Sequence, residues 1–424
     1  MNALLVEPGI LESVVSQHAE ETMHLLVQRT HLLDAPGAPW LALERIDDRL
    51  AAHVDGLRVA GACGRALCEA QAAADELPEV ARFAAAVLAL EAGDHEAVGL
   101  LLNRPGVPAG VDAGTLAAVS WVSPRFLRGI VAAWLRSDLP AEQVAALTAV
   151  AAHGVDPGAP LATFVDSADG NVAVAACRAA VASGRCDVLS ALRARAGDHQ
   201  PLVAFEAARA GLLLGDRTWS LDMLDRLVDD GIGLPALRLQ LMALDIHDGR
   251  ARLKRLSAGP QRDRLLVQGT AFVGDPALLP WLMQKVQDLA LSRLAGASIA
   301  AITGLDLAAQ GLDRPRPPDA PAILSDDPAE PDVETDEDDS LLWPDPDKLS
   351  EWSTHHGSAW TGGTRLLMGA PLSPAHVLDV LARGLNGQRI AAADHLCLLQ
   401  PGTARFNTSA PAWRQARRLA ALRP

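Results

Sequence analysis

A glycine recurs after a short, apolar, alanine-rich run at seven places in the chain. Each run is long enough for a helix, and a glycine directly after a helix takes the left-handed conformation that pairs the last free carbonyls. From the second glycine onward the gaps are 30, 31, 34, 25 and 30 residues, the period at which helix pairs stack into a solenoid. The seven are Gly93, Gly154, Gly184, Gly215, Gly249, Gly274 and Gly304.

The residues after these glycines suit the start of a second helix. Asp94, Asp216 and Asp275 each follow a glycine directly, where an aspartate side chain accepts hydrogen bonds from the first free amides of the next helix. The pattern therefore predicts an all-α fold built as a HEAT-like solenoid of helix pairs. Because a β-branched residue resists the left-handed conformation, we expect Gly184→Val to cost about 1–2 kcal/mol.

The composition is typical of a helical protein in a reducing compartment. Hydrophobic residues fill 49% of the 424 positions and aromatics only 4%, with no tyrosine, which favours closely packed helices over a sandwich or barrel. The five cysteines form no CxxC pair. The first residues lack a basic stretch, and no apolar run reaches the roughly 18 residues of a membrane span. We expect a cytoplasmic protein without membrane partners.

Negative charge is concentrated in one segment. The net charge is −15, and residues 313–350 carry 3 basic and 13 acidic side chains. This segment is rich in proline and poor in apolar residues, so we expect it to be exposed and unable to fold alone. The predicted parts are a helical N-terminal part (1–115), a HEAT-like repeat solenoid (116–312), an acidic proline-rich linker (313–350) and a small helical C-terminal part (351–424).

The end of the acidic segment holds the candidate partner-binding residues. Four acidic side chains stand in a row, and tryptophans follow shortly after them. The carboxylates are either solvated or lie along a basic surface, which belongs to a partner or to the arginine-rich tail at 413–424. The tryptophans either anchor the linker on the solenoid or form a hot spot for a partner. The candidates are Asp336, Glu337, Asp338, Asp339, Trp343 and Trp352.

The motifs that resemble catalytic or metal sites are incomplete. His18 and His24 are six residues apart, whereas a zinc helix needs four. His95 and Glu96 form a single His-Glu pair, too few for an iron site shared between repeats. The glycine-rich stretch 361–365 lacks the frame and lysine of a phosphate loop, and no GxSxG elbow is present. We therefore predict no catalytic, cofactor-binding or metal-binding residue, no bound metal or organic cofactor, and no enzymatic activity.

Several unusual segments together resemble one known family. They include HAEETMHLL, LERIDDRLAAHVDGLRVAGACG, PWLMQKVQDLALSRLAGASIAAITGLDL, LLWPDPDK and GGTRLLMGAPLSPAHVLDVLARGLNGQRIAAA. The chain is similar over nearly its whole length to an uncharacterised proteobacterial family of HEAT-repeat-like proteins. The resemblance implies a helical-repeat fold. It also implies a gene neighbourhood, because genes of family members are often found near those of type VI secretion components and their effectors.

These features favour a protein-binding function. A non-catalytic solenoid of this charge suits a basic secreted effector or toxin, which it would neutralise or chaperone as an immunity-type protein. A structural adaptor in a secretion or signalling assembly is the alternative, and a HEAT-like enzyme is a remote one. Nucleic acid is not expected as a partner, since residues 1–312 carry a net charge of −10 and would repel phosphates.

Overall fold

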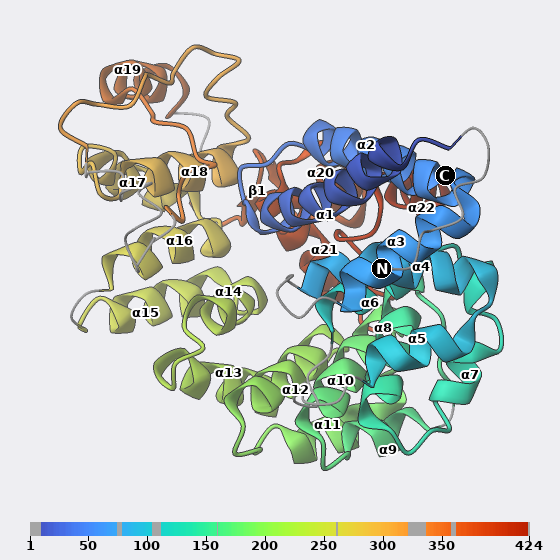
Figure 1. The fold of residues 1–424 in the computed structure, drawn as a ribbon. Helices are drawn as coiled ribbons and strands as arrows, with labels where there is room; N and C mark the ends of the chain where they lie inside the picture. Colours follow the sequence, from blue (N-terminus) through green and yellow to red (C-terminus); the bar gives the residue numbers. More distant parts are fainter. Residues whose placement is uncertain are drawn as a thin grey trace. The chain divides into compact units, whose positions relative to one another are not determined.

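The computed structural model describes residues 10–73, 79–103, 112–158, 160–259, 262–320, 336–357 and 362–422. The fold is all-α, with one two-residue hairpin as its sheet within these ranges (Figure 1). The chain divides into two compact units. Unit 1 contains residues 1–34, 40–223 and 400–424, and unit 2 contains residues 35–39 and 224–399. This division differs from the four parts expected from composition.

In unit 1 the even-numbered helices from α4 to α12 pack against one another in sequence order. Helix α4 contacts α6, α6 contacts α8, α8 contacts α10, and α10 contacts α12. Short 3-10 turns at Pro124–Leu127 (η2) and Cys186–Val188 (η3) lie between them. The helices are α1 (Glu12–Asp34), α2 (Trp40–Val59), α3 (Gly61–Ala73), α4 (Arg82–Ala92), α5 (His95–Leu102), α6 (Ala113–Trp121), α7 (Ile130–Trp134), α8 (Pro140–His153), α9 (Leu161–Val165), α10 (Gly170–Ser183), α11 (Leu189–Arg195), α12 (Pro201–Leu213) and α22 (Ala412–Leu422).

Unit 2 repeats the same arrangement. Helix α14 packs on α16 and α16 on α18, while α20 packs on α21. The hairpin turns at Met368 and Gly369, whose φ angles of 47° and 85° are both positive, as a type I′ turn requires. Helix α13 (Trp219–Asp229) crosses the boundary between the units. The elements are α14 (Leu234–Ala243), α15 (Ile246–Leu256), α16 (Asp263–Val273), α17 (Leu279–Lys285), α18 (Ser292–Thr303), α19 (Pro346–His356), β1 (Leu366–Leu367), β2 (Ala370–Pro371), α20 (Pro374–Arg383) and α21 (Asn386–Leu399).

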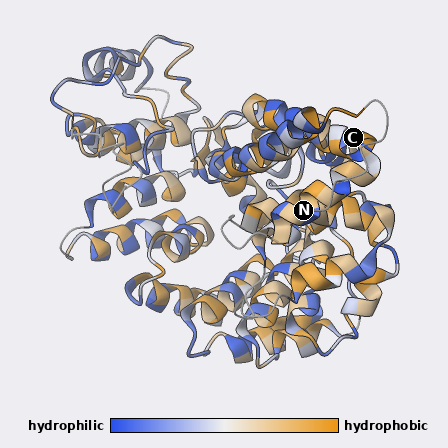
Figure 2. Cartoon of the chain, in the orientation of Figure 1, coloured by the Kyte–Doolittle hydropathy of each residue, from blue (hydrophilic) through white to orange (hydrophobic). Residues whose placement is uncertain are grey.

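In Figure 2 the helices carry both hydrophobic and hydrophilic residues, and inner helices such as α4 and α12 bury most of their residues. Alanine lets the inner helices approach closely, and α10 buries nine side chains or backbone positions between Val172 and Val181. Among the described helices none is long and apolar enough to cross a membrane.

The helix ends largely confirm the glycine pattern. Five of the seven glycines end a helix in the left-handed conformation, at α4, α8, α10, α16 and α18. Asp94 accepts a hydrogen bond from the amide of Ala97 at 3.0 Å, and Asp275 accepts one from Ala277 at the same distance. The carboxylate of Asp216 likewise accepts from the amide nitrogen of Thr218.

The prediction for Gly249 is wrong. The run that precedes it is two helices, because Asp245 begins α15 by accepting a hydrogen bond from the amide of Asp248 at 2.8 Å. Gly249 therefore lies inside α15. A Cβ there would stand 3.1 Å from the side chain of Val273, so this glycine permits close packing of α15 on α16.

Candidate interaction surfaces

The C-terminal ends of the inner helices are covered by the chain's own later residues. In unit 1 these residues are 401–414, and in unit 2 they are 362–369; we call them the return segments. The amide of Arg405 donates to the carbonyl of Val181 at 3.1 Å, near the end of α10. In unit 2 the amide of Leu366 donates to the carbonyl of Gly274 at 2.8 Å. The ends of the helix stack are thus not a free surface at these places.

Arginines of the return segments donate hydrogen bonds to the last carbonyls of several helices. Arg365 donates to the carbonyls of Leu241, Leu244 and Val273 at 2.9, 2.6 and 3.0 Å, and also to that of Met242. A cation at this place pairs carbonyls that the helix leaves free and complements the negative end of the helix dipole. The glycine-rich stretch 361–365 lacks the sequence frame of a phosphate loop. Its arginine instead binds backbone carbonyls, while Thr361 lies outside the described residues.

Arg414 has the same role in unit 1. Its guanidinium donates to the carbonyls of Ser120, Trp121 and Val122 at 2.8, 2.9 and 3.2 Å, at the end of α6. Burial, with the nearby positive charge of Arg417, lowers the pKa of Arg414 to about 10. The guanidinium stays charged at neutral pH, so its hydrogen bonds to these carbonyls are charge-assisted.

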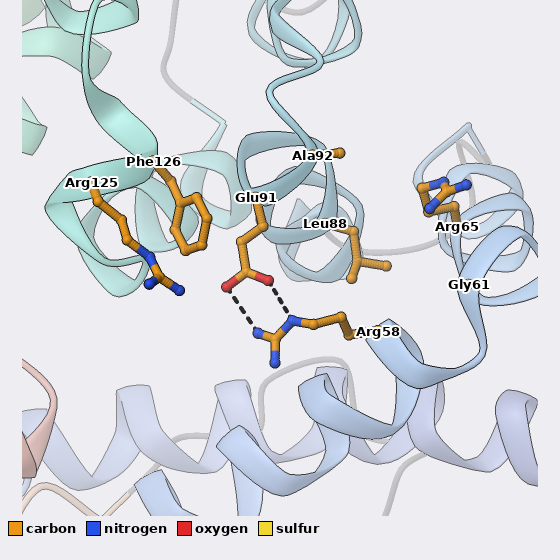
Figure 3. Close-up of a pocket in the computed structure, with 8 residues that line it drawn as sticks. All are labelled: Arg58, Gly61, Arg65, Leu88, Glu91, Ala92, Arg125 and Phe126. Carbon is orange, nitrogen blue, oxygen red and sulfur yellow. Dashed lines mark hydrogen bonds and ion pairs between the residues drawn. The ribbon is translucent and has the colours of Figure 1, made fainter.

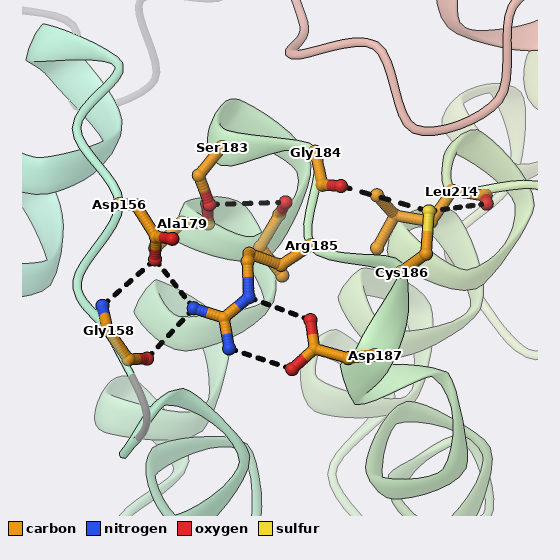
Figure 4. A network of polar contacts seen from close by, with 10 residues as sticks. Asp156, Gly158, Ala179, Ser183, Gly184, Arg185, Cys186, Asp187 and Leu214 are labelled. Carbon is orange, nitrogen blue, oxygen red and sulfur yellow. Dashed lines mark hydrogen bonds and ion pairs between the residues drawn. The ribbon is translucent and has the colours of Figure 1, made fainter.

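A second set of polar contacts joins the turns that follow consecutive inner helices of unit 1 (Figure 4). Arg185, directly after Gly184, donates to Asp156 in the turn after α8 at 2.5 Å and to Asp187 at 2.7 Å. Arg185 in turn lowers the pKa of Asp187 through this hydrogen bond. Because these charged groups pair between the turns that follow neighbouring helices, the network stabilises the packing of those helices.

The acidic candidates lie in unit 2, against α16 and α18. Asp338 is buried and forms a bidentate pair with Arg264, with both distances at 2.9 Å. Asp336 pairs with Arg293 at 2.8 Å, and the hydrogen bond from that arginine lowers the pKa of Asp336. Glu337 contacts Arg264 at 3.2 Å but is 82% exposed, and Asp339 is exposed. The run therefore has two carboxylates held by the unit and two directed to solvent.

The two tryptophan candidates are half-buried and contact their own unit. The guanidinium of Arg293 lies 4.7 Å from the ring centre of Trp343. Trp352 packs against the core of unit 2 and stacks on His356. These contacts are those expected of anchors that hold the segment on α18 and its neighbours. The third tryptophan of the sequence pattern, Trp360, lies outside the described residues.

Unit 1 also contains an arginine-lined groove that no sequence pattern predicts. Three adjoining hollows of about 370, 260 and 370 Å³ are lined by residues from α2, α3, α4, α6, η2 and α22, and the first hollow shares lining residues with each of the other two. Figure 3 shows the first hollow, where Arg58 and Glu91 form a bidentate pair at 2.7 and 2.9 Å. Exposed arginines stand around this pair: Arg65 on α3, Arg125 on η2 and Arg417 on α22. No linear motif marks the groove, because its residues come from four distant stretches of the chain.

Several buried titratable groups are either paired or kept neutral by burial. Asp394 and Arg238 form an ion pair at 2.9 Å, and burial lowers the pKa of the adjacent His395 to about 3. Burial also raises the pKa of the Cys68 and Cys177 thiols to about 12, so both are protonated and poor nucleophiles at neutral pH. None of these groups lines any of the three hollows.

The histidine pattern of the N-terminus produces a packing contact. The Nδ1 atoms of His18 and His53 lie 3.1 Å apart between α1 and α2, whereas His24 contacts Gln28. His95 begins α5 directly after the capping Asp94. Within the described ranges no group of three or more histidine, cysteine, aspartate or glutamate side chains is arranged to hold a metal ion.

Comparisons with known proteins give no further assignment. No model of a known family, no curated protein and no solved structure matches the chain.

Proposed function

We propose that this chain is a non-catalytic, HEAT-like helical-repeat protein whose function is to bind another protein in the cytoplasm. The observation that carries the proposal is the serial packing of α4, α6, α8, α10 and α12 in unit 1 and of α14, α16 and α18 in unit 2. Such stacks form extended surfaces whose stability comes from contacts between neighbouring repeats. Binding residues can then be placed on the surface without disturbing a central pocket.

The acidic run of unit 2 favours a basic partner. Arg264 and Arg293 hold Asp338 and Asp336 in place, so the exposed carboxylates of Glu337 and Asp339 are presented from an ordered segment. Ordering before binding reduces the entropy lost in the complex. The overall charge of −15 adds long-range attraction for a basic protein.

Neutralisation or chaperoning of a type VI secretion effector or toxin is the specific form of this proposal. It is supported by the acidic balance and by the resemblance to proteins encoded beside such genes. The structural adaptor remains the second candidate, favoured by the fact that unit 2 presents exposed carboxylates whereas unit 1 presents exposed arginines.

The test uses two double variants with the same change in charge. In the first, Glu337→Gln and Asp339→Asn remove the exposed carboxylates; in the second, Asp336→Asn and Asp338→Asn remove the paired ones. We expect the first variant to slow association with the basic partner several-fold at about 50 mM salt, with an unchanged melting temperature. The second should lower the melting temperature, because it removes the carboxylate that pairs with Arg293 and leaves Arg264 with only the exposed Glu337.

The partner is obtained by tagging the full chain in its host and is then purified for the rate measurement. Co-expression with that partner separates the two candidate roles: a neutralising protein restores growth in the presence of a toxic partner, and an adaptor does not. Equal association rates for wild type and the first variant at all salt concentrations would contradict the acidic run as the binding surface.

A further inference from the structure

The arginine-lined groove of unit 1 has the side chains of a protein-binding hot spot. Arginine and tryptophan are the residue types most enriched where binding energy is concentrated. The chain has only nine tryptophans and six phenylalanines, yet Trp121, Trp413 and Phe126 all line the second hollow. Trp413 is 37% exposed and meets the ring of Trp121 edge to face at 4.9 Å.

Three arginines of the groove form no ion pair with the described residues of unit 1. Among the described residues no carboxylate lies within ion-pair distance of Arg65, Arg125 or Arg417. Arg125 lies over the ring of Phe126, 4.5 Å from its centre. Exposed guanidinium groups beside aromatic rings offer a ligand both charge pairing and apolar contact.

The charge of the groove is opposite in sign to the net charge of the chain. The second hollow is lined by four arginines and two carboxylates, on a chain with a net charge of −15. Its arginines are nevertheless interrupted by acidic side chains: Asp55 and Glu91 lie between those of the second hollow, and Glu69 lies beside Arg65. A nucleic acid needs a continuous basic track for its phosphates, whereas a peptide can place single carboxylates opposite single arginines.

We propose that this groove binds an acidic segment of a partner protein, with carboxylates opposite Arg65, Arg125 and Arg417 and an apolar side chain against Phe126 and Trp413. The arginine fork matches a carboxylate in bidentate geometry, as the Arg58–Glu91 pair in the same hollow does. This occupant is opposite in charge to the partner proposed for the acidic run of unit 2, so the two surfaces serve different contacts.

The direct test is selection from a displayed library of random 12-residue peptides on the full-length chain. We expect the enriched peptides to be rich in aspartate and glutamate around an aromatic or aliphatic residue. A fluorescent member of that set, measured by anisotropy, should bind about 3- to 10-fold more weakly after each of Arg65→Gln, Arg125→Gln and Arg417→Gln, and beyond 30-fold more weakly after all three.

Matched controls separate this contact from folding and from the other surface. Arg193→Gln removes another exposed arginine, on α11, that does not line the groove, so it should leave peptide affinity unchanged. Glu337→Gln with Asp339→Asn should also leave it unchanged, which distinguishes failure of the groove from failure of the acidic run. Melting temperatures report whether each variant is folded.

Three results would overturn the inference. Enriched peptides that lack acidic residues would show that the arginines do not select the ligand. The same conclusion would follow if the triple variant enriched the same peptides as the wild type. Equal affinity for a peptide with every glutamate changed to glutamine and every aspartate to asparagine would reduce the groove to an apolar contact. Tighter binding of a 12-nucleotide single-stranded DNA than of the acidic peptide would make it a phosphate-binding surface.

Discussion

The helix ends at Gly154 and Gly184 lie in the same unit and share one sequence signal, but they need glycine for different reasons. Both residues are left-handed, with φ of 63° and 69°. A Cβ on Gly154 would meet no other group within 4 Å, whereas one on Gly184 would stand 2.2 Å from the carbonyl oxygen of Gly402. The first glycine satisfies only the local backbone, while the second also lets the return segment lie directly on the end of α10.

In unit 2, two more helix-ending glycines lie directly against a return segment. A Cβ on Gly274 would stand 2.5 Å from the carbonyl oxygen of Leu366, and one on Gly304 would stand 2.6 Å from that of Met368. A recurring glycine therefore combines a general rule of helix termination with a requirement set by residues far along the chain. Substituting these glycines measures separately what helix termination and the distant contact contribute to stability.

The largest difference is expected between Gly184→Ala and Gly154→Ala. Both should lose about 1–2 kcal/mol because alanine resists the left-handed conformation. Gly184→Ala additionally forces the backbone at Gly402 to move, which raises its total cost to about 4 kcal/mol, above the roughly 1–2 kcal/mol that the sequence alone predicts even for valine. Urea unfolding of both variants gives the comparison directly. Equal costs would mean that the return segment does not press on the end of α10.

In unit 2, Arg365→Gln should destabilise by about 3 kcal/mol, since it removes the charged donor from the carbonyls of Leu241, Leu244 and Val273. Arg383→Gln is the matched control, because that arginine is 76% exposed and its nearest carboxylate contact is 3.8 Å away. Thermal unfolding followed by circular dichroism measures both. If the two variants melt alike, Arg365 does not hold the helix ends.

The end of α8 beside Gly154 should depend on pH. Burial, together with the charge of Arg414, lowers the pKa of His153 from 6.5 to about 4, and its Nε2 lies 3.0 Å from the carbonyl of Val119. Above pH 6.5 the histidine is neutral in both folded and unfolded chains and has no effect on the pH dependence. Between pH 6.5 and 4 only the unfolded chain takes up the proton, so stability falls as the pH is lowered and levels off below pH 4.

By pH 5 this loss amounts to roughly 2 kcal/mol. His153→Gln should remove it, so wild type and variant must differ in the slope of unfolding free energy against pH between 7 and 5. Parallel slopes would show that the imidazole is accessible to water in the folded state.

The sequence predicted the parts of the fold that depend on local chemistry. Glycine and aspartate mark helix boundaries through their own backbone and side-chain preferences, so the ends at Gly93 and Gly274 and the caps at Asp94 and Asp275 were predictable. Gly249 was misread because a glycine that allows two helices to pack looks the same in sequence as one that ends a helix.

The contacts between distant stretches could not be predicted in this way. Arg365 lies more than 90 residues from each carbonyl that it binds, and nothing near it in sequence distinguishes it from a surface arginine. The groove likewise depends on Arg417 being brought to Arg58 by the packing of α22 on α2. The sequence identified the acidic run but not which of its carboxylates would be paired, since Arg264 and Arg293 belong to other helices.

Hydrogen exchange of the return segments tests the central claim that the chain covers its own helix ends. The account predicts that the amides of Arg405, Leu366, Met368 and Gly369 exchange on the order of 100-fold more slowly than unstructured amides, because they donate to carbonyls at or near the ends of α10, α16 and α18. Exchange of these four amides at the unstructured rate, while the amides within α10, α16 and α18 stay protected, would contradict it.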